Sequence, residues 1–242
     1  MHRIFIGFDP READAFAVAR SSIRRHMPPP RDMEIRGVVL DRLKQSGLYT
    51  RPIEMRRGVD RPIMWDSISG AAMSTQHANA RFLVPIIQRN GLALFMDGDV
   101  LVRASLDPMF DIAKADSSKA VWVVKHRMPE TGAVKMDGQE QARYARKNWS
   151  SVCLWNCDHP STRALTAEMV NALPGRDLHR FCWMPDDAIG ELDPEWNHLV
   201  GVHPKNPDAK IAHFTLGTPS MPGYHGCEFA DEWRDELSRW AA

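Results

Sequence analysis

Hydrophobic residues recur along the chain in two spacings, which predict strands and helices. Short apolar or alternating runs predict strands over residues 3–8, 33–40, 92–102, 120–124, 150–156 and 211–214. Stripes with helical spacing predict helices over residues 13–23, 67–73, 74–89, 106–115, 161–172, 184–190 and 229–240. The stretch 41–66 is rich in Arg, Gly and Pro with little periodicity, so we expect it to be irregular. The alternation of strands and helices predicts one mixed α/β sheet domain.

The strand over residues 92–102 carries two carboxylates in the middle of an apolar run. Asp97 and Asp99 are separated by Gly98, and residues two apart on a strand project to one face, roughly 6.5–7 Å apart. Two carboxylates at a buried strand end repel each other and must share a proton or hold a cation. Oxygen ligands suit Mg²⁺ or Mn²⁺, and Gly98 leaves room for a ligand to approach the backbone. The alternative is two polar residues that close a strand at a turn.

The first strand leads directly into a helix start. Asp9 at the N-cap, Pro10 at N1 and Glu12 at N3 form a capping-box arrangement. Because α/β folds bind ligands just outside the carboxyl ends of strands, Phe8 and Asp9 are candidates for holding a base or a ribose. The alternative is that Asp9 serves only as a helix cap.

Other polar residues also have both a functional and a structural interpretation. Arg81 lies shortly before the aspartates and could meet them or a phosphate, or form a surface salt bridge. Residues 127–147 form a long polar segment, interpreted as a substrate-facing flap or a solvated loop. Asp186 and Asp187 begin a short predicted helix, where acids are often only partners of the helix dipole.

Composition places the chain among ordinary soluble proteins. The 242 residues are 43% hydrophobic and 26% charged, with a net charge of zero, so bulk electrostatics do not indicate a nucleic-acid partner. The four cysteines show no zinc spacing, which fits a reducing cytoplasm. No apolar run approaches the length of a membrane span, and the first strand does not read as a signal peptide. The length fits one large domain, and we expect a cytoplasmic location.

A series of short motifs resembles family 8 glycosyltransferases and related bacterial enzymes of the GT-A fold. In chain order these motifs are Phe8-Asp9, Ser74 with Arg81-Phe82-Leu83-Val84-Pro85, Met96-Asp97-Gly98-Asp99, Ser150 to Asn156, Asp186-Asp187, Trp196-Asn197, and His213-Phe214-Thr215 with Gly217. None of them is specific alone, but their order matches that of the family from Arg3 to Gly217.

The resemblance implies a single GT-A-like domain with a mixed, mostly parallel central sheet. Residues 1–102 would be the nucleotide-binding half, and residues 103–242 would complete the metal and acceptor sites. It also implies a nucleotide-sugar donor, most often a UDP-sugar, transfer with retention, and Mn²⁺ or Mg²⁺ bound by Asp97, Asp99 and His213. Catalytic roles would fall to Asp186 and Asp187, and Asp186 could stabilise the cationic sugar or attack it. Donor contacts would come from Phe8, Asp9, Arg81, Gly98, Ser150, Ser151 and Gly217.

Four departures from the family pattern keep other functions open. Trp149-Ser150-Ser151 replaces the usual Asn-Ala-Gly or Asn-Ser-Gly, and Asp186 stands beside Asp187 where the family often has Gln. Gly217 follows His213 by four positions instead of three, and the lysine expected after Gly217 is missing. A sugar-nucleotide-binding protein without transferase activity is therefore one alternative. The run from Phe95 to Leu101 also resembles the nucleophile motif of haloacid-dehalogenase-type phosphohydrolases, with Asp97 attacking phosphorus. The acceptor could be a glycan, a lipid or a protein.

Overall fold

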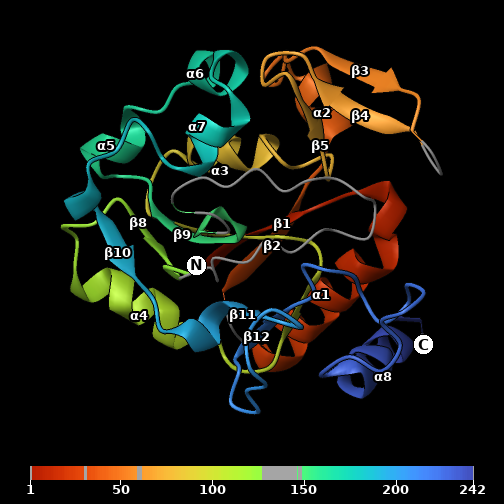
Figure 1. Cartoon of the computed structure of the whole chain (residues 1–242). Helices are drawn as coiled ribbons and strands as arrows, with labels where there is room; N and C mark the ends of the chain where they lie inside the picture. Colours follow the sequence, from red (N-terminus) through yellow and green to blue (C-terminus); the bar gives the residue numbers. More distant parts are fainter. Residues whose placement is uncertain (1, 30–31, 59–61, 127–145, 147–148, 242) are drawn as a thin grey trace.

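The structure is a computed structural model. Its central element is a six-stranded mixed sheet (Figure 1). The structure describes all residues except 1, 30–31, 59–61, 127–145, 147–148 and 242. Across the sheet the strands are β10 (Ile189–Glu191), β8 (Val121–Val123), β9 (Val152–Asn156), β6 (Leu92–Met96), β1 (His2–Gly7) and β2 (Met33–Val38). All of them run in the same direction except β9, which is antiparallel to both of its neighbours.

Alternate residues of these strands divide between two cores, one on each face of the sheet. Phe5 and Phe95 face one core, whereas Ile4, Leu94 and Met96 face the other, as the side-chain period of a strand requires. On the first face lie α2 (Leu40–Gln45), α3 (Val84–Gln88), α6 (Ala167–Ala172) and α7 (Gly175–His179), with α5 (Pro160–Arg163) packed near α3. On the second face lie α1 (Ala13–His26) and α4 (Asp107–Ala115). The result is the layered α/β arrangement that the sequence predicts.

A second, smaller sheet joins the first through the Asp-Gly-Asp segment. Its strands are β11 (His198–Leu199), β12 (Ile211–His213) and β7 (Val100–Val102). The C-terminal helix α8 (Ala230–Ala241) packs against α1 beside this sheet (Figure 1). The predicted strand 92–102 is therefore two strands, because the chain leaves the central sheet after Met96 and enters the second sheet at Val100.

The prediction that residues 41–66 are irregular is wrong, because α2 and two strands of a third sheet lie there. The strands of this sheet are β3 (Ile53–Arg56), β4 (Ile63–Asp66) and β5 (Ala71–Met73). The helix predicted over residues 67–73 is also wrong, since these residues form a turn and β5. A buried ion pair between Arg51 and Asp66 anchors this sheet, and a contact between residues 15 apart is not visible in a hydrophobic pattern.

Three predicted helices differ from the observed ones. The predicted helix 74–89 is a turn followed by the 3-10 helix η2 (Ala80–Leu83) and α3. Residues 161–172 divide into α5 and α6, because the Thr166 side chain accepts a hydrogen bond from Met169 N and begins a new helix. Residues 184–190 contain the 3-10 helix η4 (Asp186–Ala188) and then β10, where Gly190 leaves space for the Trp122 ring.

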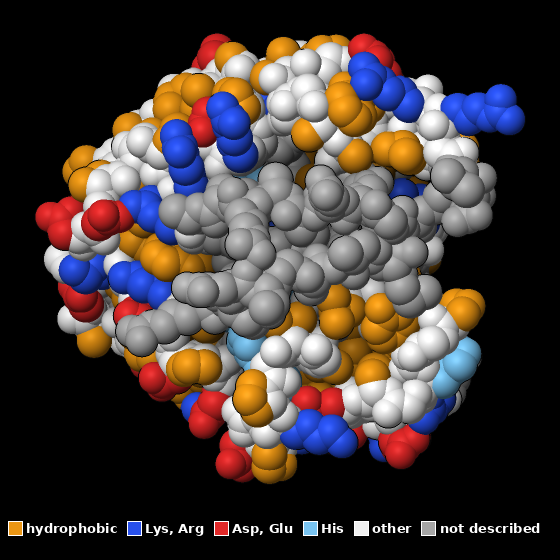
Figure 2. Space-filling model, in the orientation of Figure 1, with side chains coloured by type: hydrophobic (Ala, Val, Ile, Leu, Met, Phe, Trp, Pro, Cys, Tyr) orange, Lys and Arg blue, Asp and Glu red, His pale blue; other side chains and the backbone are white. Residues whose placement is uncertain are grey.

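The remaining short elements are the 3-10 helices η1 (Pro10–Glu12), η3 (Trp149–Ser151) and η5 (Pro194–Asn197). The predicted flap over residues 127–147 lies outside the described residues apart from Arg146. In the described part of the chain, no helix has the length and apolar composition needed to cross a membrane. On the face shown in Figure 2, both acidic and basic side chains lie near the rim.

Candidate metal centre

Asp97, Gly98 and Asp99 form the three-residue connection between β6 and β7. The amide of Asp97 donates a hydrogen bond to Ser151 O over 2.9 Å, which holds the end of β6 against the start of β9. A Cβ on Gly98 would lie 2.5 Å from Gly7 O, so the glycine is required for close packing against the end of β1. The space beside Gly98 is thus filled by backbone, which differs from the expected space for a ligand.

Strand pairing brings His213 next to the two aspartates. In β12, His213 is opposite Val100 of β7, and Phe214 N donates to Asp99 O over 2.9 Å. His213 Nε2 lies 3.3 Å from Asp99 Oδ1 and 3.8 Å from Asp97 Oδ2. One ligand atom from each of the three residues lies within 4.8 Å of the others. The structure therefore brings together the three residues that the sequence predicts as metal ligands.

Two side chains of the protein, Arg81 and His77, lie against Asp97. Asp97 Oδ1 lies 2.9 Å from Arg81 Nη1 and 3.3 Å from His77 Nε2. Burial opposes ionisation of Asp97, but Arg81 and His77 outweigh it and hold the pKa of this carboxyl well below its usual range. The repulsion that the sequence predicts between the two aspartates is thus offset in part by the Arg81 guanidinium.

Asp99 and His213 influence each other in the same way. Burial opposes the charge on both groups, yet their attraction outweighs it, so the pKa of Asp99 is lowered and that of His213 is raised. The two aspartates are consequently ionised at neutral pH, as metal binding requires.

The donor set fits a small divalent cation. Two carboxylates and one imidazole are ligands that Mn²⁺ accepts, and carboxylates with water suit Mg²⁺. Among the described residues, none forms a hydrogen bond of good geometry with the buried Asp97 Oδ1, despite the ionic contact with Arg81. Asp97 Oδ1 is held by its ionic contact with Arg81. The atoms that would bind a cation are therefore Asp97 Oδ2, Asp99 Oδ1 and His213 Nε2.

Arg81 and the segment Ser150-Ser151 lie beside Asp97. Arg81 is 7% exposed and donates to Ser150 O over 2.9 Å and to Ala78 O over 3.0 Å. The hydroxyl of Ser150 lies 2.6 Å from His179 Nδ1. The contacts of Arg81 hold its guanidinium beside Asp97. Donor contacts by Arg81, Ser150 and Ser151 remain predictions.

Asp9 is occupied by contacts within the protein. Its carboxylate caps η1 by accepting from Arg11 N over 3.0 Å, and it also accepts from the Arg11 guanidinium and from Gln76 N. Burial opposes its ionisation, but Arg11 lowers the pKa of Asp9 overall. The capping interpretation is confirmed, and the adjacent Phe8 packs edge-on against Phe16. Binding of a base or ribose by Phe8 and Asp9 stays a prediction.

Asp186, Asp187 and Gly217 are not part of the group of metal-ligand atoms. Asp186 is 88% exposed in η4 and pairs with Arg146, while the carbonyl of Asp187 accepts from Lys119 Nζ over 2.9 Å. Gly217 lies in the turn after β12, where a Cβ would meet the Tyr224 ring at 2.6 Å. The structure does not test the catalytic and donor-binding roles predicted for them.

The structure adds residues that the sequence does not identify as functional. His77 is 3% exposed and occupies the space that a side chain on Gly7 would fill. Asn197 contacts the far side of the His213 ring. Glu12 is half-buried near the aspartates, and burial, together with the charges of Asp99 and Asp9, raises its pKa to about 7. Of these contacts, the sequence indicates only Asn197, through the Trp196-Asn197 motif.

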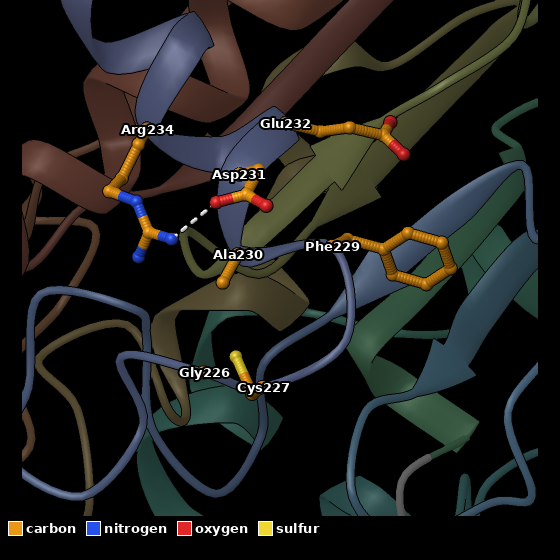
Figure 3. A pocket seen from close by; sticks show the side chains of 7 residues that line it. All are labelled: Gly226, Cys227, Phe229, Ala230, Asp231, Glu232 and Arg234. Carbon is orange, nitrogen blue, oxygen red and sulfur yellow. Dashed lines mark hydrogen bonds and ion pairs between the residues drawn. The ribbon is translucent and has the colours of Figure 1, made fainter.

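A separate hollow lies at the start of α8. Figure 3 shows Arg234 and Asp231 at this hollow, where Arg234 Nη2 donates to Asp231 Oδ1 over 2.6 Å. Burial raises the pKa of the Cys227 thiol there, so this cysteine is not an activated nucleophile. None of the residues predicted for the functional site lines this hollow.

The fold is that of GT-A glycosyltransferases. The bifunctional glycosyltransferase WbbM superposes with a TM-score of 0.61 and 15% identity, over 98% of this chain and 49% of that one. The galactosyltransferase LgtC, in complex with donor and acceptor sugar analogues, superposes with a TM-score of 0.56 and 13% identity. The match covers 98% of this chain and 95% of LgtC. Glycosyltransferase GlyE of Streptococcus pneumoniae TIGR4 superposes with a TM-score of 0.61 and 13% identity, over 100% of this chain and 62% of GlyE. The chain thus spans about half of the length of WbbM.

A comparison of sequences identifies a relative of the chain. It is 36% identical to Protein CDI of Arabidopsis thaliana over 244 residues, which cover 98% of this chain and 86% of the plant protein. No family model matches the chain. The protein belongs to the family of Protein CDI.

Proposed function

We propose that this protein is a metal-dependent glycosyltransferase that moves a sugar from a nucleotide-sugar donor to an acceptor. The observation that carries the proposal is the position of Asp97, Asp99 and His213 at the junction of β6, β7 and β12 in a GT-A fold. Their ligand atoms converge although the residues come from two distant segments of the chain. A turn that only closed a strand would not need a buried histidine opposite its two carboxylates.

In this proposal the three ligand residues hold Mn²⁺ or Mg²⁺ at the diphosphate of the donor. When bound, the cation supplies Lewis-acid neutralisation of the charge that develops on the leaving diphosphate. The three residues bind it as two carboxylates and a neutral imidazole, so His213 must release any proton before the cation binds. Arg81 and His77 keep Asp97 ionised and ready to bind.

We further propose a UDP-sugar as the donor and retention of configuration at the anomeric carbon, both from the resemblance to family 8. Asp186 is the proposed carboxylate at the sugar ring, with Asp187 beside it. For Asp186 to reach a sugar, its surface ion pair with Arg146 would have to open. The acceptor can be a glycan, a lipid or a protein.

The test begins with thermal unfolding in the presence of Mn²⁺ or Mg²⁺ with UDP, GDP, CDP or ADP. A ligand that binds only the native state at about a hundredfold excess over its Kd stabilises it by about 2.7 kcal/mol. We expect UDP with Mn²⁺ to raise Tm more than either alone. If no nucleotide raises Tm with either cation, the proposed donor site is wrong.

Release of UDP from UDP-sugars then separates a transferase from a binding protein. Turnover that requires the cation supports the transferase, whereas binding without any turnover in the presence of varied acceptors supports the non-catalytic alternative. The GT-A fold of the chain does not support the phosphohydrolase alternative.

A further inference from the structure

The ring of His213 is held on its far side by Asn197. Asn197 is completely buried at 0% exposure at the end of η5, and its Oδ1 lies 3.0 Å from His213 Nδ1. An amide oxygen can only accept a hydrogen bond, so His213 Nδ1 carries the proton. In the neutral ring the lone pair is then on Nε2, the nitrogen that faces Asp97 and Asp99.

The direction of the Asn197 amide is set by two further neighbours. Its Nδ2 donates to Ser151 Oγ over 2.8 Å and to His126 Nε2 over 2.9 Å. His126 is buried, and burial lowers its pKa to about 3, so the ring is neutral and can accept at Nε2. With a cation on Nε2, the neutral His213 ring carries its proton on Nδ1, and a reversed amide would direct its NH₂ group at that proton.

His126 is itself held firmly in place. It follows β8, its amide donates to Val124 O over 3.0 Å, and its carbonyl accepts from the indole of Trp149 over 3.4 Å. The network therefore runs from the sheet through His126 and Asn197 to His213, across residues 71 and 16 positions apart.

We propose that Asn197 and His126 are positioning residues, which fix His213 with its proton on Nδ1 and its Nε2 lone pair toward Asp97 and Asp99. The inference rests on the proposed function in taking a divalent cation as the ligand of that lone pair. Neither residue touches the cation; each acts through the orientation of the His213 ring. Partners of this kind, bound to the second nitrogen of a metal-binding histidine, fix its tautomer and raise its basicity.

The first test measures Mn²⁺ affinity of the full chain by calorimetry or by electron paramagnetic resonance. We expect Asn197→Ala and His126→Leu to weaken Mn²⁺ binding by about 10–100-fold, the usual effect of removing such a partner. Asn171→Ala is the matched control, because Asn171 also makes three hydrogen bonds, to Leu48 O, to Ala167 O and from Thr50 N. We expect Mn²⁺ affinity to be unchanged in this control.

A second readout does not depend on the metal. Long-range ¹H–¹⁵N correlation spectra of the metal-free protein, recorded at a pH where His213 is neutral, distinguish its two tautomers. We expect the proton on Nδ1 in the wild type and a mixture of tautomers in His126→Leu. His126→Gln offers a side-chain oxygen as acceptor in place of Nε2, and we expect it to restore the wild-type tautomer and much of the Mn²⁺ affinity. Circular dichroism identifies any variant that fails to fold. If both variants fail to fold, the tautomer of His213 in the wild type alone tests the proposal.

The possible outcomes separate this inference from the proposed function. A proton on Nε2 in the wild type, or equal Mn²⁺ affinity in the wild type and both folded variants, would overturn the positioning role and leave the metal site standing. A wild-type protein that carries the Nδ1 proton but binds neither Mn²⁺ nor Mg²⁺ would overturn the proposed function and still confirm the orientation of His213.

Discussion

The small sheet β3–β4–β5 and the junction of β6 with β7 both bury an aspartate beside an arginine. In the small sheet, Asp66 pairs with Arg51, and their side chains are 1% and 0% exposed. At the junction, Asp97 pairs with Arg81, and the aspartate side chain is 13% exposed. Both aspartates form an ion pair with an arginine, but the other hydrogen bonds to the two carboxylates differ.

Asp66 has a donor for each of its oxygens. Its Oδ2 accepts from Arg51, Ser69 and Asn79, and its Oδ1 accepts from Ile68 N. Arg51 donates in addition to Val170 O and Leu173 O, which attaches the small sheet to α6. Asp97, by contrast, has an oxygen without a hydrogen bond from the described residues. Both oxygens of Asp66 are thus used within the fold, whereas Asp97 Oδ2 faces His213 and is available for a ligand.

The largest expected effect is on stability, from Asp66→Asn. The substitution leaves the buried Arg51 without a counter-charge, and arginine cannot lose its proton, so we expect the free energy of unfolding to fall by about 3–5 kcal/mol. Unfolding in urea measures the loss, and Mn²⁺ affinity should remain at the wild-type value. A loss below about 1 kcal/mol would show that the pair contributes little.

Asp99→Asn should have the opposite pattern. We expect it to abolish Mn²⁺-dependent stabilisation, which is about 2.7 kcal/mol at a hundredfold excess over Kd. Metal-free stability should fall by less than in Asp66→Asn, because His213, unlike Arg51, can release its proton when its partner is lost. Thermal unfolding with and without Mn²⁺ measures both quantities. Retention of the full Mn²⁺ effect would exclude Asp99 as a ligand.

Glu12 tests whether the junction is short of compensating charge. Its folded pKa, about 7, lies above the ordinary value of 4.5, so ionisation destabilises the fold. The penalty is absent below the ordinary pKa, grows between the two values and is complete above the folded pKa. We therefore expect Glu12→Gln to stabilise the metal-free protein by about 1–2 kcal/mol above pH 7 and hardly at all near pH 4.

Chemical unfolding at both pH values measures this effect. A bound cation should reduce the gain, since it offsets the charge of Asp99 that acts on Glu12. A gain of equal size at both pH values would mean that the glutamine improves packing, and the electrostatic explanation would be wrong.

The same comparison explains which parts of the molecule the sequence could predict. Strands β1, β6 and β9 are short apolar runs, and the two aspartates after β6 stand out because apolar residues surround them. The small sheet was missed because its strands bury few apolar residues and depend on one ion pair. Neither a period nor a composition identifies a pair such as Arg51 with Asp66.

The functional site divides in a similar way. Asp97, Asp99 and His213 belong to motifs with a recognisable spacing, and the structure brings them together. His126 and Asn197 meet only because β8 and η5 end near one another, 71 positions apart in the chain. A lone buried histidine or asparagine has no sequence signal that separates structure from function, so these contacts required three-dimensional information.

The smallest expected effect comes from the exposed pair of Arg56 and Glu54, on the same small sheet as Asp66. Arg56 Nη2 lies 2.9 Å from Glu54 Oε2, as close as Arg81 lies to Asp97, but the two side chains are 46% and 54% exposed. Water already solvates both charges, and ordering two long side chains costs entropy, so the pair adds little to stability. A double-mutant cycle with Arg56→Met and Glu54→Gln should give a coupling energy within experimental error, and added salt should not change it. A coupling as large as that between Arg51 and Asp66 would mean that distance alone, and not burial and hydrogen-bond saturation, separates the two kinds of ion pair.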